Sequence, residues 1–65
     1  MSVRDFIERQ DKDRRDLMRY FDHLFCEEMG LISKIRYKVP FYYNRSWICY
    51  LNPTKTEGIE LVFLR

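Results

Sequence analysis

The spacing of apolar residues changes near Ser33, and this change restricts the chain to a mixed fold. Before that point, apolar residues recur along one side of a helix: Leu17, Met18, Tyr20, Phe21, Leu24, Phe25 and Met29. After it, apolar residues alternate with basic ones, with Ile35, Tyr37 and Val39 set between Lys34, Arg36 and Lys38. A helical period followed by a period of two predicts the α+β class, with helices packed against an antiparallel sheet.

Two helices are expected in the first half of the chain. Ser2 and Asp5 have the spacing of a capping pair, which predicts a short helix over residues 3 to 8 or 9. After a polar run, the apolar stripe predicts a second helix over residues 13–29, and Gly30 is expected to end it.

The second half of the chain is expected to form strands. The first begins at Ser33, and Pro40 is expected to bend or interrupt it, because proline donates no hydrogen bond to a sheet. The later runs are 41–43, 46–51 and 59–64. A two-residue turn at Asn44 and Arg45, where the asparagine tolerates positive φ, is expected to join the first two runs. A loop over 52–58 is expected to precede the last run. The expected architecture is one or two N-terminal helices packed on a three-stranded antiparallel β-meander, in a single domain over residues 1–65.

The expected core combines one helix face with alternate strand residues: Phe21, Leu24, Phe25, Ile35, Tyr37, Phe41, Ile48, Tyr50, Leu61 and Phe63. The last strand is apolar on both faces, and such a strand requires cover on both sides. A second subunit, the short first helix, or a longer natural domain would each supply that cover. A chain of 65 residues is also small enough for a partner to be its natural source of extra stability.

Charge and cysteine content limit the choice of function. Residues 1–29 contain six Lys and Arg against eight Asp and Glu, a net charge of −2, whereas residues 30–65 contain six against two, a net charge of +4. The overall charge of +2 is too small to indicate a polyanion partner. Cys26 and Cys49 are expected to be free thiols of a reduced, cytoplasmic protein, because no signal peptide is recognisable and no apolar run is long enough to span a membrane.

The strand region resembles the YdhG-like family of bacterial proteins, a family of unknown function. The resemblance lies in residues 35–43, in Ile48-Cys49-Tyr50-Leu51-Asn52-Pro53 and in the glycine-led run 58–63. Ser33 departs from the acidic residue frequent in the family, and members continue beyond the third strand, so the resemblance implies a domain that lacks the family's C-terminal part. It implies a small cytoplasmic α+β domain that is similar in architecture to frataxins, some of which carry iron.

The aromatic hairpin is the first candidate site. Tyr42, Tyr43, Trp47 and Tyr50 are expected to form a surface for a ligand or a protein partner. With Lys34, Arg36 and Lys38 nearby, the same side chains could stack on RNA bases, as in some sheet-based RNA-binding modules. No motif of those modules is present, and we expect no nucleic-acid partner.

Acidic residues of the second helix are the alternative site. Asp11, Asp16 and Asp22 offer oxygen ligands for iron, and His23 and Cys26 stand one helical turn apart on the side expected to be polar. Basic residues interleave with the carboxylates, which favours ion pairs along a solvated helix over a metal site.

Catalytic patterns are lacking in the sequence. One histidine and two glycines provide neither a nucleophile–base pair recognisable by spacing nor a phosphate-binding loop. The expected function is therefore non-enzymatic: a binding domain without a cofactor, forming a homodimer or binding another protein through the aromatic hairpin. The alternative is a frataxin-like carrier of iron.

Overall fold

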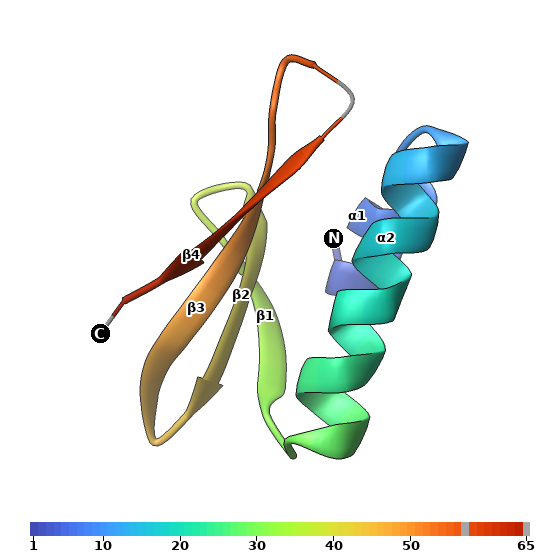
Figure 1. The fold of residues 1–65 in the computed structure, drawn as a ribbon. Coiled ribbons are helices and arrows are strands. Elements are labelled where there is room, and N and C mark those ends of the chain that lie inside the picture. Colours follow the sequence, from blue (N-terminus) through green and yellow to red (C-terminus); the bar gives the residue numbers. More distant parts are fainter. Residues whose placement is uncertain (57, 65) are drawn as a thin grey trace.

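Helices and strands follow one another in separate halves of the computed structural model, which describes residues 1–56 and 58–64. The elements are α1 (Val3–Glu8), α2 (Lys12–His23), the π-helical turn η1 (Leu24–Glu28), β1 (Ile32–Arg36), β2 (Val39–Asn44), β3 (Ser46–Pro53) and β4 (Ile59–Phe63). Both helices pack on one side of an antiparallel sheet with the order β1-β2-β3-β4 (Figure 1), which confirms the expected α+β architecture with four strands in place of three. Glu57, in the loop expected over 52–58, lies outside the described residues. Within those residues, no helix has the length and apolar character needed to cross a bilayer.

Local signals set the ends of the helices. Ser2 Oγ accepts a hydrogen bond from the backbone N–H of Asp5 at 3.1 Å, and the Asp5 carboxylate accepts one from the N–H of Ser2, so the expected capping box forms. At the other end, Gly30 has a φ of +69°, which ends the helix in the left-handed region. The last turn is π-helical rather than α-helical, and this wider turn rotates Met29 out of the predicted apolar face into solvent.

The fourth strand arises from a turn that the alternating pattern conceals. Tyr37 and Lys38 have φ values of 52° and 66°, so the chain reverses there, and Arg36 pairs with Val39 across a two-residue hairpin. The strand expected to continue from Ser33 through Val39 is therefore two strands. Pro40 interrupts nothing: it lies within β2, paired with Ile35.

The hairpin between β2 and β3 is tighter than expected and contains a bulge. Asn44 pairs with Ser46, which leaves Arg45 alone at the turn, and Arg45 rather than the asparagine takes the positive φ of 69°. Tyr42 pairs with Cys49 and the next residue pairs with Trp47, so Ile48 is an extra residue on β3. Such a bulge changes which side chains face each side of the sheet.

The buried side of α2 is rotated away from the centre of its apolar stripe. Met18 and Phe25 are buried, but Leu17 and Tyr20 are exposed, and Asp22, expected on the polar side, is half-buried. The physical reason is the fully buried Tyr42, whose hydroxyl donates a hydrogen bond to Asp22 Oδ1 at 2.8 Å. A buried hydroxyl requires an acceptor, and the inward carboxylate provides it.

The core lies between the helices and the sheet. Its buried members are Val3, Ile7, Met18, Phe25, Leu31, Tyr42, Cys49 and Leu51. Of the predicted core residues, Phe25 belongs to this cluster, and Phe21, Leu24, Ile35, Ile48 and Leu61 pack against it half-buried. Tyr37 and Phe63 were wrongly assigned to the core, because they are 76% and 58% exposed, the first at the β1–β2 turn and the second near the end of the edge strand β4.

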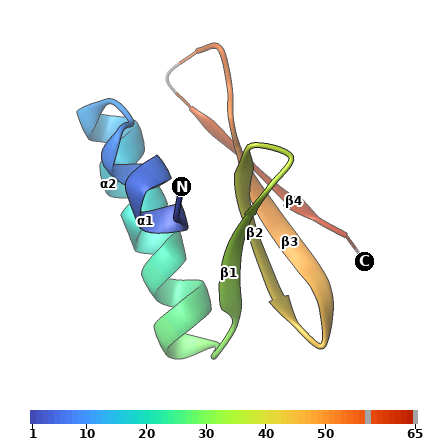
Figure 2. The ribbon, with the colours of Figure 1, turned by 180° about the vertical axis from the view of Figure 1, so that it is seen from behind.

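Only one face of the sheet has cover from helices. Figures 1 and 2 show α1 and α2 on the same side, with no element over the opposite side. The β3–β4 loop is tied to α2 by Arg14, whose guanidinium donates hydrogen bonds to the backbone oxygens of Thr54, Thr56 and Gly58 at 2.7–3.2 Å. The sheet thus presents one open face, and its residues define the candidate site.

Candidate functional site

Aromatic rings cover the open face of the sheet. Phe41 on β2 stacks on Tyr50 of β3, with ring centroids 4.6 Å apart and planes 16° from parallel. Trp47 contacts Phe41 edge-on at 5.6 Å and Tyr43 at 4.7 Å. We call these four residues, with Arg36, the aromatic platform.

The bulge at Ile48 is what places the tryptophan there. Cys49 and Leu51 point into the core, so regular alternation would direct Trp47 to the same side. The extra residue reverses the alternation, and Trp47 joins Tyr50 on the open face. The platform is therefore a product of one irregularity in β3.

A guanidinium group lies over the rings. The Arg36 carbon Cζ is 4.5 Å from the centroid of Trp47, 5.0 Å from that of Tyr37 and 5.7 Å from that of Phe41. Cation–π contacts of this kind hold an arginine in place without a carboxylate. Among the residues that the structure describes, Arg36 has no ion pair, and its one side-chain hydrogen bond runs to the Tyr37 hydroxyl at 3.4 Å.

The platform adjoins a hollow of about 480 Å³ on the same face. It is lined by Arg36, Tyr37, Val39, Phe41, Tyr50, Asn52 and Leu64. The lining is apolar apart from one guanidinium, one amide and two phenol hydroxyls. Such a surface suits an apolar partner that supplies a few matching polar groups.

One predicted member of the partner surface is on the wrong side. Tyr43, Trp47 and Tyr50 lie on the open face as expected, but Tyr42 is completely buried on the helix side. Burial and then the hydrogen bond to Asp22 raise the pKa of the Tyr42 hydroxyl far above its ordinary value. This residue therefore has a structural role. Phe41, predicted for the core, is buried as expected, but on the open face, where it packs against Tyr50 and Arg36.

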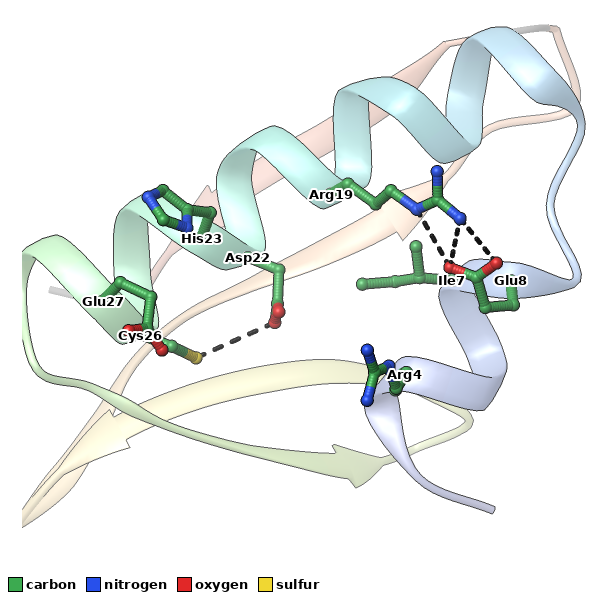
Figure 3. A pocket seen from close by; sticks show the side chains of 8 residues that line it. All are labelled: Arg4, Ile7, Glu8, Arg19, Asp22, His23, Cys26 and Glu27. Atoms are coloured by element: carbon green, nitrogen blue, oxygen red, sulfur yellow. Dashed lines mark hydrogen bonds and ion pairs between the residues drawn. The ribbon is translucent and has the colours of Figure 1, made fainter.

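A second, more polar groove of about 710 Å³ lies on the helix side (Figure 3). It is lined by Arg4, Ile7, Glu8, Arg19, Asp22, His23, Cys26 and Glu27. Three of its charged groups are engaged within the fold: Arg19 donates to both Glu8 oxygens at 2.6–2.9 Å, which lowers the pKa of Glu8, and Asp22 accepts from Tyr42. These contacts join α1 to α2 and α2 to the sheet, so they have a structural purpose.

The residues of the proposed iron site are dispersed. Asp11 precedes α2 as its N-cap residue, and Asp16 accepts a hydrogen bond from Lys12 at 3.1 Å. His23 is exposed, whereas Asp22 and Cys26 turn inward, with Cys26 Sγ 3.8 Å from Asp22 Oδ1. Within the described part of the chain, no three His, Cys, Asp or Glu side chains converge on a position that could hold a metal ion.

Both thiols are poor nucleophiles in this environment. Burial raises the pKa of Cys26, and the Asp22 carboxylate raises it further. Burial also raises the pKa of Cys49, which has no exposed surface. A thiol with a raised pKa holds little of the reactive thiolate at neutral pH.

Comparison with family models, curated proteins and solved structures found no match to this chain. Sequence reasoning missed Phe41 as a member of the platform, and it named Arg36 only as a basic neighbour of the aromatic residues. The position of Phe41 could have been found from strand parity, since Phe41 and Tyr43 are two residues apart and must share a face. The bulge that places Trp47 on the predicted surface could not, because no sequence signal marks it.

Proposed function

We propose that the protein is a non-enzymatic, cytoplasmic interaction domain that binds another protein chain through the aromatic platform. The observation that supports this most is the absence of cover: among the described elements, none packs on the open face, although its rings form a continuous apolar cluster. Tyr43, Trp47 and Tyr50 are half-buried, and Tyr37 and Leu64 in the adjoining hollow are exposed. Apolar clusters with such accessible surface mark interaction sites on folded proteins. Tyrosine, tryptophan and arginine are also the residues that contribute most to protein interfaces.

The arrangement of the rings favours a protein over a nucleic acid. Base stacking needs a free ring face, but Arg36 lies over Trp47, and Tyr50 stacks on Phe41. Phe41 is only 5% exposed. The rings of Trp47 and Tyr50 are thus already packed against side chains of their own chain, and half-buried rings of this kind suit contact with another side-chain surface.

Other observations bear on the rest of the proposal and on its alternative. The raised pKa values of Cys26 and Cys49 support a non-enzymatic role. Kinship with the YdhG-like family rests on the residues that resemble it, and the helix-on-sheet fold agrees with that kinship. Iron transport is the less favoured alternative, because the carboxylate of Asp16 is paired with Lys12 and the candidate ligands do not converge.

Site-specific photo-crosslinking in cells tests the proposal. A photoreactive phenylalanine analogue replaces Tyr43 on the platform, or Tyr20 on the exposed side of α2 as the matched control. We expect protein adducts from position 43 that are absent from position 20. Equal adducts from both positions, adducts to RNA alone, or none from position 43 would overturn the proposal.

A further inference from the structure

We propose that the partner of the platform is a second copy of this chain, packed face to face about a two-fold axis parallel to the strands, so that Arg36 of each copy pairs with Glu60 of the other. This inference rests on the proposed function and names its partner. The observation that supports this dimer is the register of the strands.

Pairing across the sheet arranges the open face in rows perpendicular to the strands. Arg36 pairs with Val39 and Asn52 pairs with Glu60, and the β2–β3 register aligns Val39 with Asn52. The first row is therefore Arg36, Val39, Asn52 and Glu60. The second row is Lys34, Phe41, Tyr50 and Val62, and the third contains Ile32, Tyr43 and Trp47.

The first row is complementary to its own reverse in charge, and the other two rows pair aromatic rings. A two-fold axis parallel to the strands keeps every row opposite itself and places β1 of one copy over β4 of the other. In the first row this brings the strand position of Arg36 opposite that of Glu60, and the guanidinium turns from its place over Trp47 toward the carboxylate of the other copy. In the second it brings Phe41 opposite Tyr50 and Lys34 opposite Val62, and in the third Tyr43 opposite Trp47. An isologous contact of this type repeats every pair twice.

Among the residues that the structure describes, the two charged ends of the first row, Arg36 and Glu60, lack ionic partners. Glu60 accepts a hydrogen bond from the Asn52 amide at 3.3 Å, and among the described residues neither Glu60 nor Arg36 forms an ion pair. A twofold axis perpendicular to the strands would place β1 over β1, so that the strand with the basic residues Arg36 and Lys34 would face the same basic strand of the other copy. Charge therefore selects the parallel axis.

The size of the face sets the expected affinity. Four strands about 4.8 Å apart and about five residues long cover roughly 19 Å by 17 Å. This is small for an interface, so we expect a dimer that dissociates in the micromolar range. Sheets that pack in this way align their strands within about 30°.

Two charge-reversed chains test the geometry. In Glu60→Arg alone, and in Arg36→Glu alone, the symmetric dimer would contain two like-charged pairs. When the two variants are mixed, each pair regains opposite charges. Sedimentation velocity should show each variant dimerising at least about tenfold more weakly than the wild type, and the mixture recovering as a heterodimer.

A second readout covers the case in which Arg36→Glu does not fold, since Arg36 packs on Trp47. Glu60 is exposed, so Glu60→Arg should keep the wild-type circular dichroism spectrum, and added salt should strengthen its dimer by screening the repulsion. Salt that leaves this dimer unchanged would contradict the pairing.

The outcomes separate this inference from the function it rests on. A monomeric wild type, a mixture no stronger than its components, or dimerisation abolished by Leu17→Glu on α2 would overturn the inference. If position 43 still crosslinks to a different protein, the proposed function stands without the dimer. If position 43 crosslinks to no protein, both fail.

Discussion

Removing one hydroxyl group, in Tyr42→Phe, tests why α2 is rotated toward the sheet. Tyr42 is fully buried, and its hydroxyl donates a 2.8 Å hydrogen bond to Asp22. The substitution preserves the ring and its contact with Phe25, whose centroid is 4.9 Å away. It leaves the half-buried carboxylate without this donor.

The expected loss in the free energy of unfolding follows from the type of hydrogen bond and its burial. A hydrogen bond to a charged group contributes about 1.5–3 kcal/mol, and Asp22 keeps some contact with water, so we expect a loss of about 1.5–2 kcal/mol. A domain of this size has a total stability of about 3–5 kcal/mol. The variant should therefore lose roughly a third or more of its stability, and its Tm should fall by roughly 11–15 °C.

Urea denaturation followed by circular dichroism measures this loss. The matched control is Tyr20→Phe, which removes the same hydroxyl from a side chain that is 62% exposed and should change the free energy of unfolding by less than about 0.5 kcal/mol. A double-mutant cycle with Asp22→Ala should give a coupling energy of at least about 1 kcal/mol. Equal losses in Tyr42→Phe and Tyr20→Phe would refute the reasoning.

Three further outcomes follow from other contacts. The Arg19 guanidinium lowers the pKa of Glu8, so this pair stabilises the fold above the ordinary pKa of Glu8 and ceases to do so as pH falls through the lowered value. In unfolding experiments at a series of pH values, Glu8→Gln should therefore lose less stability in acid than the wild type. Equal dependence of stability on pH in the two proteins would argue against the pair. Arg14→Met removes the donors to the β3–β4 loop and should cost about 1 kcal/mol, with faster amide exchange confined to that loop; unchanged exchange would contradict this contact. Ellman's reagent should modify Cys26 slowly, faster as pH rises, and Cys49 only as the chain unfolds, so equal rates would contradict the burial of Cys49.

The features predicted correctly from sequence are those set by neighbours in the chain. The capping box at Ser2, the helical stop at Gly30 and the change of period near Ser33 depend on residues a few positions apart. Local preference and periodicity are sufficient for such features.

The features that were missed depend on distant contacts or on unusual backbone. Tyr37 and Lys38 adopt positive φ without glycine or asparagine, so the alternation of apolar and basic residues continues through the turn. The rotation of α2 follows from Asp22 meeting Tyr42, twenty residues later in the chain. The bulge at Ile48, which places Trp47 on the predicted surface, was also missed, and the first two of these features moved a predicted core or site residue.

Accessibility of Trp47 tests the central claim, that the open face of the sheet is the binding surface. The chain has a single tryptophan, so its fluorescence reports on the platform alone. Acrylamide quenching measured over a dilution series should weaken as the wild type is concentrated and should stay strong in Glu60→Arg. Quenching that is independent of concentration while the wild type dimerises would place the interface elsewhere and contradict the account.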